Sequence, residues 1–171
     1  GYVGPQQAAP ILLDGLRRPE YRGYDSAGVA VTNGKIDVRK AEGKIDRLAD
    51  LLEHEPLQGT IGIGHTRWAT HGEPSDVNAH PHTDPSGEFV VVHNGIIENY
   101  LELKAELTND GHRFVTETDT EVIAHLLEKH YDTSLEQAVL NTLEELDGVF
   151  AFAAISPSLS TTTTRQHRVA G

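Results

Sequence analysis

The chain contains 171 residues, of which 26 are acidic and 14 are lysine or arginine, and its formal net charge is −12. This negative charge argues against a nucleic-acid-binding protein, because binding to phosphates requires a basic surface. No run of about 18 apolar residues and no signal peptide is present, which argues against a membrane protein and favours a cytoplasmic one, and the lack of cysteine excludes disulfides and thiolate metal sites.

The apolar residues in the first half of the chain alternate between helical and extended spacing. They predict a helix over 6–17, strands over 27–31 and 36–38, a helix over 45–52 and a strand over 60–64. The dipeptide Asn33-Gly34 separates the first two strands, and it favours the tight turn of a β-hairpin. These two strands are therefore expected to pair in one sheet.

Three helices are predicted in the second half of the chain, over 100–107, 122–127 and 135–146. Gly111 follows the first of them and can end it, because glycine readily adopts the backbone conformation of a helix C-cap. Thr118 with Glu121, and Ser134 with Gln137, match the capping box, in which two side chains satisfy backbone N–H groups at a helix start. We therefore expect the second and third helices to begin at these pairs.

The strands predicted over 89–92 and 149–155 are apolar on both faces. Such a strand must be covered on both sides, so the pattern predicts two sheets packed face to face with helices outside, in an α+β or α/β protein. After Pro157 a stretch rich in serine and threonine lacks apolar alternation. We expect residues 158–171 to form an atypical, flexible tail beyond a domain that spans residues 1–157.

Two polar segments, His65–Gly72 and His93–Asn99, follow predicted strands. In the second, the Asn94 amide and the Gly95 backbone N–H can point the same way and form an oxyanion hole, which stabilises the tetrahedral intermediate of acyl transfer. Asn-Gly is also a common turn. However, residues 96–100 predict the start of a helix and no returning strand, which favours the oxyanion hole.

Arg67 and Asp119 suggest how a substrate is held. The planar fork of Arg67 suits a carboxylate, although in such an acidic chain it could equally serve as an ion-pair partner. Asp119 is also typical of a helix N-terminus, where the dipole favours negative charge. A guanidinium near an oxyanion hole indicates a substrate with a carboxylate at one end and an amide at the other, but no convincing nucleophile is present.

A cluster of histidines offers a metal site as an alternative. Five lie within 29 residues: His65, His71, His80, His82 and His93. Imidazole together with carboxylate can bind zinc. Because no pair has the spacing of a helical zinc motif, we expect these histidines to bind no metal.

Four motifs carry a resemblance to a known family. They are Tyr21-Arg22-Gly23-Tyr24-Asp25-Ser26, His65-Thr66-Arg67-Trp68-Ala69-Thr70-His71-Gly72, His93-Asn94-Gly95 and Thr118-Asp119-Thr120-Glu121. In order and spacing, up to about Ile155, the chain resembles the glutaminase domains of the glucosamine-6-phosphate synthase family, the glutamine–fructose-6-phosphate aminotransferases (isomerizing). Related amidotransferases share the Asn-Gly element but not the first two motifs. The resemblance implies a four-layer αββα sandwich of the N-terminal nucleophile hydrolase type.

The resemblance also implies an enzyme, a class II glutamine amidotransferase that hydrolyses L-glutamine. The ammonia released would serve the synthesis of glucosamine 6-phosphate from fructose 6-phosphate, for amino-sugar biosynthesis. The implied partners are the sugar isomerase domains of a homo-oligomeric full-length enzyme, which are absent from these residues. No cofactor and no metal are implied.

Residue roles follow from the same resemblance. In the family the nucleophile is a cysteine in a leading Cys-Gly-Ile-Val, with its own α-amino group as general base, and it is expected four residues before Gly1. The implied roles are Asn94 and Gly95 for the oxyanion, Arg67 for the substrate carboxylate with Thr70 and His71 nearby, Asp119 for its ammonium, Trp68 as a gate and Arg22 as a loop support. Without the cysteine, the alternative is a catalytically silent module that binds glutamine or glutamate.

Overall fold

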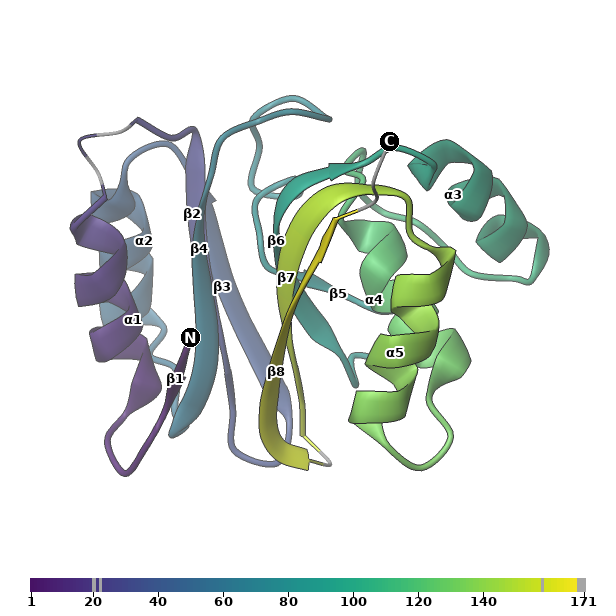
Figure 1. Ribbon diagram of the computed structural model, residues 1–171. Coiled ribbons are helices and arrows are strands. Elements are labelled where there is room, and N and C mark those ends of the chain that lie inside the picture. The colour runs from purple at the N-terminus through teal and green to yellow at the C-terminus, as the bar shows by residue number, and fades with distance from the viewer. Residues whose placement is uncertain (20, 22, 158, 169–171) are drawn as a thin grey trace.

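Two antiparallel sheets pack face to face, and helices cover the outer face of each (Figure 1). The computed structural model describes residues 1–171 except 20, 22, 158 and 169–171, and the side chains of 159–168 are also left undescribed. The layers follow the order helix, sheet, sheet, helix, which confirms the predicted α+β class and four-layer αββα sandwich. None of the described helices is long and apolar enough to cross a membrane.

The first sheet has the strand order β1-β4-β2-β3. Its strands are β1 (Tyr2–Val3), β2 (Ser26–Thr32), β3 (Ile36–Glu42) and β4 (Ile61–Arg67), and its outer face carries α1 (Ala8–Arg17) and α2 (Ile45–His54). The predicted hairpin is confirmed, because β2 pairs with β3 across Asn33-Gly34. Alternate residues of β2, Ala27, Val29 and Val31, are buried in a cluster with side chains of both helices.

The second sheet has the strand order β5-β6-β7-β8. Its strands are β5 (His82–Thr83), β6 (Val90–Ile97), β7 (Gly148–Ser156) and β8 (Leu159–Arg168), and its outer side carries α3 (Tyr100–Asn109), α4 (Glu121–His130) and α5 (Leu135–Glu145). As predicted, β7 is apolar on both faces. Phe150 and Phe152 pack with the helices, whereas Ile155 packs between the sheets with Ile63 of β4 and Val92 of β6.

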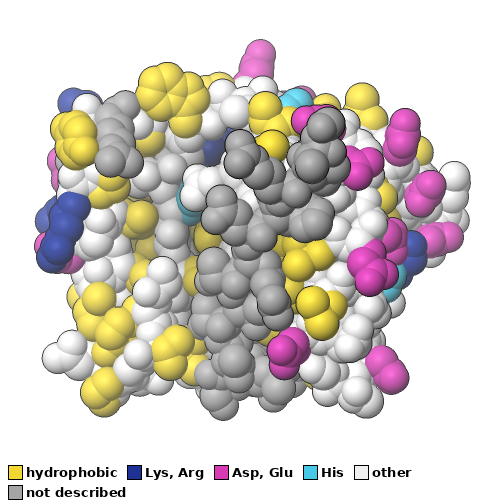
Figure 2. All heavy atoms as spheres, in the orientation of Figure 1, with side chains coloured by type: hydrophobic (Ala, Val, Ile, Leu, Met, Phe, Trp, Pro, Cys, Tyr) yellow, Lys and Arg dark blue, Asp and Glu magenta, His cyan; other side chains and the backbone are white. Residues whose placement is uncertain are grey.

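Many acidic side chains lie on the helical surface of the second sheet. In the view of Figure 2 they gather over the side of the molecule that carries α3 and α5. Glu102 and Glu106 of α3, and Glu136 and Glu144 of α5, are exposed. Much of the negative charge therefore belongs to a solvated surface.

The strand β6 is longer than predicted. It continues through Asn94 and Gly95 to Ile97, and α3 begins only at Tyr100, so the expected helix start at residue 96 is wrong. Gly95 has φ +115°, a conformation that favours glycine. The strand can therefore change direction locally at Gly95 while its register with β7 is kept.

The segment after Pro157 also differs from its prediction. Residues 159–168 form β8, which pairs antiparallel with β7, whereas the sequence predicts a flexible tail there. Strand pairing uses backbone groups and does not require apolar alternation, and threonine is common in strands. The expected tail also includes residues 158 and 169–171, which lie outside the described part of the chain.

One of the two predicted capping boxes is wrong. At the start of α4 the residue before the helix is Thr120, whose side chain makes no capping bond, and the Glu121 carboxylate instead accepts N–H groups of Val115 and Thr116. At the start of α5, Ser134 accepts the Gln137 N–H at 3.4 Å, so this half of the second box is confirmed.

Candidate active site

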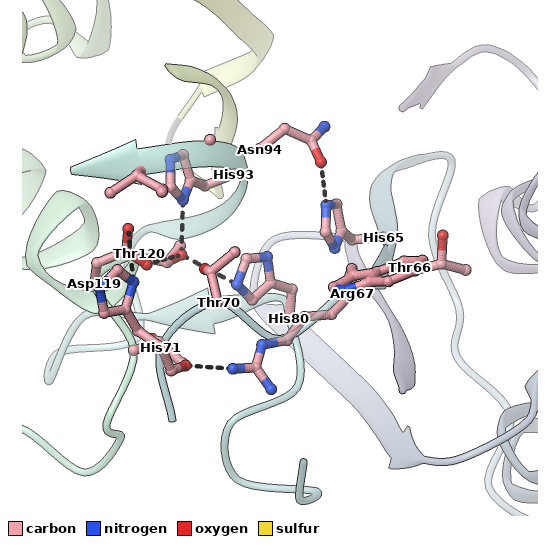
Figure 3. A pocket seen from close by; sticks show the side chains of 14 residues that line it. His65, Thr66, Arg67, Thr70, His71, His80, His93, Asn94, Asp119 and Thr120 are labelled. Atoms are coloured by element: carbon pink, nitrogen blue, oxygen red, sulfur yellow. Dashed lines mark hydrogen bonds and ion pairs between the residues drawn. The ribbon is translucent and has the colours of Figure 1, made fainter. Parts of the chain in front are cut away.

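A pocket of about 360 Å³ lies where the end of β4 faces the middle of β6 (Figure 3). Its lining comes from β4 and the loop after it, from β6, and from the segment before α4: His65, Thr66, Arg67, Trp68, Thr70, His71, His80, His93, Asn94, Gly95, Ile96, Thr118, Asp119 and Thr120. The seven described residues to which the sequence gives a site role all line this pocket. The eighth, Arg22, lies outside the described residues.

Asn94 projects from β6 toward His65 of β4, and the two side chains face each other across the pocket (Figure 3). The distance between His65 Nε2 and Asn94 Oδ1 is 2.9 Å. Burial lowers the pKa of His65, so its ring is neutral near pH 7 and carries one N–H. Because an amide oxygen can only accept, His65 Nε2 is the donor, and the Asn94 Nδ2 group remains as a donor for another partner.

Glycine is required at position 95 of β6. A Cβ atom there would lie 2.2 Å from the Val149 carbonyl oxygen and 2.7 Å from the Phe150 Cα atom, both in the backbone of β7. The positive φ of Gly95 adds strain for any other residue. The backbone that follows Asn94 is therefore held close to β7.

Arg67 is buried at the end of β4. Its Nη2 group donates to the carbonyl oxygens of His71 and Gly72, the latter at 2.9 Å, and Nη1 lies 3.4 Å from Asp25 Oδ1. These bonds hold the turn that carries Thr70 and His71 against β4. Arg67 thus has the structural role of an ion-pair partner. Its position in the pocket lining is also consistent with the other interpretation, the binding of a substrate carboxylate.

Asp119 is buried immediately before α4, and its carboxylate lines the pocket. Its Oδ2 atom accepts the Ile97 backbone N–H at 2.9 Å, which joins the start of α4 to the end of β6. His71 Nδ1 is 3.8 Å from the same oxygen. The pocket therefore has a buried negative charge on the side opposite β4.

Three buried histidines, His80, His82 and His93, form a network at the pocket, and His80 and His93 belong to its lining. Burial is the largest cause that lowers the pKa of His93 to about 4 and those of His80 and His82 well below the ordinary value. The Thr120 hydroxyl lies 2.9 Å from His93 Nδ1 and 3.1 Å from His80 Nε2. Neutral imidazoles each offer one donor and one acceptor, so this network provides buried polar side chains without adding charge.

Two contributors to the site carry no role in the sequence-based prediction. Asp25, in the Tyr24-Asp25-Ser26 motif, accepts the Ala69 N–H, and its carboxylate faces Arg67. His65 was considered only as a metal ligand, and its bond to Asn94 joins residues that are 29 positions apart. Trp68, to which the resemblance gives the role of a gate, lines the pocket and is 70% exposed.

Comparison with known proteins identifies relatives along most of the chain. The family described as glutamine amidotransferase domain matches residues 65–170. The glutamine–fructose-6-phosphate aminotransferase (isomerizing) of Aquifex aeolicus is 60% identical over 157 residues, and that of Caldanaerobacter subterraneus subsp. tengcongensis is 55% identical over 156 residues. Each match covers 91% of this chain and 26% of the relative, so the chain spans about a quarter of the length of these relatives.

Two solved structures share the fold. One is the glutamine phosphoribosylpyrophosphate amidotransferase from B. subtilis complexed with ADP and GMP, with a TM-score of 0.77. The other is described as the allosteric regulatory enzyme of purine biosynthesis, with a TM-score of 0.79. Each is 32% identical to this chain, and each match covers 91% of this chain and 34% of the other.

Proposed function

Because the chain belongs to the glutamine amidotransferase domain family, we propose that it is the glutamine-hydrolysing part of a glutamine–fructose-6-phosphate aminotransferase (isomerizing). The observation that carries this proposal is the pocket. It joins an oriented amide donor, a guanidinium and a buried carboxylate, from Asn94, Arg67 and Asp119. L-Glutamine carries the matching groups, namely a side-chain amide, an α-carboxylate and an α-ammonium.

Asn94 and Gly95 form the oxyanion hole in this proposal. The His65 bond to Asn94 Oδ1 supports it, because it leaves the Nδ2 donor for an oxyanion. The pairing of β5 with β6 covers only Val90 and Val91, and further along β6 the Ile97 N–H donates to Asp119. N–H groups of alternate residues lie on the same edge of a strand. The Gly95 N–H is therefore expected on the same edge of β6 as the Ile97 N–H, the edge that faces Asp119 and the pocket.

The substrate's amino-acid end binds between β4 and the start of α4. The Asp119 carboxylate pairs with the α-ammonium, with Thr70 and His71 beside it. The α-carboxylate binds at the Arg67 side. The Nη2 group of Arg67 already donates to two loop carbonyl oxygens, and one N–H of Nη1 faces Asp25, so the second Nη1 N–H and Nε remain for the substrate.

In this proposal the nucleophile is the cysteine of a leading Cys-Gly-Ile-Val, as the family resemblance implies. β1 supports this position. Tyr2 of β1 pairs with Gly62 of β4, and Val3 pairs with Ile61. If β1 continued toward its N-terminal side in the same register, the fourth residue before Gly1 would lie opposite Arg67, at the pocket. A leading Cys-Gly-Ile-Val brings the cysteine to that place.

The reaction then proceeds by acyl transfer. The thiolate attacks the amide carbon of glutamine, and the oxyanion of the tetrahedral intermediate is held by Asn94 and Gly95. Collapse of the intermediate releases ammonia and leaves a thioester, which water hydrolyses to glutamate and the free thiol. In the whole enzyme, the ammonia passes to fructose 6-phosphate on sugar isomerase domains.

Adding Cys-Gly-Ile-Val ahead of Gly1, with a free amino terminus, tests the proposal. We expect the extended protein to release glutamate from glutamine, whereas the chain that begins at Gly1 and an extension with serine in place of cysteine remain at background. An inactive extended protein that is folded and still binds glutamate by calorimetry would support the alternative, a silent binding module. Normal turnover by the unextended chain would refute the mechanism.

A further inference from the structure

A second group of functional side chains lies on the outer helical layer, away from the pocket. The backbone N–H of His112 donates to the Leu107 carbonyl at 2.9 Å, which fixes His112 at the end of α3. His125 and Glu128 lie on α4, three positions apart and so on one helix face. One ligand atom from each of His112, His125 and Glu128 falls within 4.8 Å of the other two.

The two imidazoles meet through the same ring atom. His112 Nδ1 is 3.0 Å from His125 Nδ1 and 3.3 Å from Glu128 Oε2. On the other side of its ring, His125 Nε2 points toward Glu121 Oε1 at 3.6 Å. Both oxygens of the Glu121 carboxylate act as acceptors, Oε1 for the Val115 N–H and Oε2 for the Thr116 N–H. An N–H on Nε2 is therefore favoured, which leaves a lone pair on His125 Nδ1.

Two side chains face the same nitrogen atom, His112 Nδ1. With His125 Nδ1 unprotonated, its lone pair and the Glu128 carboxylate both face His112 Nδ1, which carries at most one hydrogen. His112 Nδ1 can donate to only one of these two acceptors, so the other is open to a further partner. A cation placed among the three atoms would satisfy all of them.

We propose that His112 Nδ1, His125 Nδ1 and the Glu128 carboxylate bind a divalent transition-metal ion of the zinc type. Zinc takes imidazole nitrogen and carboxylate oxygen at about 2.0–2.2 Å in a tetrahedron, which places neighbouring ligands about 3.3 Å apart. The two distances from His112 Nδ1 match this spacing. Glu121 behind His125 supplies the carboxylate that commonly orients a metal-binding imidazole.

The site is accessible yet held in place. His125 is fully buried, and its ring stacks on Phe114 with centroids 4.1 Å apart and an interplanar angle of 9°. His112 and Glu128 are half-buried, so an ion can enter from solvent. Bound metal would tie the segment after α3 to α4, beside the loop that leads to Asp119. The site differs from the expectation of no metal, which was drawn from the histidines at positions 65–93 and from the family resemblance, and it does not depend on the proposed function.

Calorimetric titration of the untagged chain with Zn²⁺ alone tests the proposal. We expect one ion per chain, and a visible ligand-field spectrum of tetrahedral type when Co²⁺ is added instead. His112→Ala and Glu128→Gln should each weaken zinc binding by more than about 100-fold, beyond the about 10- to 100-fold effect of losing an outer partner. Circular dichroism would show that each variant is folded.

His130→Ala provides the matched control. His130 also lies on α4 and pairs with a glutamate, Glu145, but no second histidine joins them among the described residues. This variant should keep the zinc affinity of the parent chain. The proposal is overturned if the parent binds no zinc, or if His112→Ala binds it as tightly as the parent does.

Discussion

Glu121, the first residue of α4, collects several hydrogen bonds whose loss can be measured. Its Oε1 atom accepts the Val115 N–H at 2.8 Å, and its Oε2 atom accepts the Thr116 N–H at 2.8 Å and the Thr116 hydroxyl at 2.7 Å. Glu121→Gln replaces one of these oxygens by an NH₂ group. Whichever way the amide turns, one backbone N–H loses its acceptor and meets another donor.

The expected cost follows from two independent considerations. Burial alone would raise the pKa of Glu121, but the His125 side chain and the Val115 and Thr116 donors outweigh it and lower the pKa from 4.5 to about 2. A shift of this size corresponds to about 3 kcal/mol of stability at neutral pH. An unsatisfied buried donor costs about 1–3 kcal/mol. We therefore expect Glu121→Gln to lower the free energy of unfolding by about 2–3 kcal/mol at pH 7.

Urea unfolding at several pH values tests this. Because the folded pKa of Glu121 is lowered, its contribution is complete above about pH 5 and is lost as pH falls toward about 2. The gap between parent and Glu121→Gln should therefore be about 1 kcal/mol smaller at pH 4 than at pH 7. The exposed Glu106→Gln serves as control and should stay within about 0.5 kcal/mol of the parent. A Glu121→Gln gap below that value, or one independent of pH, would refute the reasoning.

Three further predictions concern the pocket and the sheets. In the protein extended by Cys-Gly-Ile-Val, Asn94→Ala should lower kcat for glutamine hydrolysis by about 100-fold or more, and His65→Ala should lower it by about tenfold. Neither variant should change KM much. A change in KM as large as the change in kcat would contradict the oxyanion assignment. Burial lowers the pKa of His93 from 6.5 to about 4, so as pH falls the unfolded chain binds a proton at this residue before the folded chain does. Urea unfolding should therefore show that His93 lowers the free energy of unfolding by about 3 kcal/mol between pH 7 and pH 4. The His93→Gln variant should lose correspondingly less over the same range. Hydrogen exchange by peptide should find the amides of 150–154 among the slowest, because β7 pairs on both sides; fast exchange there would contradict the observed sheet order.

The layered fold could be predicted from apolar periodicity, since β2 alternates and β7 is apolar on both faces. The short strands β1 and β5 have two residues each, too few for a periodic signal. β8 was missed because its pairing depends on the neighbouring backbone of β7 and not on its own apolar residues. The Glu121 bonds to Val115 and Thr116 were missed because they run back along the chain, away from the helix that the capping pattern addresses.

The site was predictable where local chemistry identifies it and not where it depends on sheet packing. Arg67, Asn94 and Asp119 stand in motifs that follow strands or precede a helix, and the pocket brings them together. The partner of Asn94 could not be read from its own segment, because His65 lies in the other sheet. Asp25 likewise reaches Arg67 only through the pairing of β2 with β4.

The spacing of the two sheets links the apolar core to the chemistry of the pocket. Ile63 and His65 are two residues apart on β4, and Val92 and Asn94 are two residues apart on β6, so each pair shares a strand face. Ile63 and Val92 pack together between the sheets, and one step further along the same strands the apolar contact gives way to the bond from His65 to Asn94. Packing of Ile63 and Val92 therefore holds the two strands together beside the point where His65 orients the Asn94 amide.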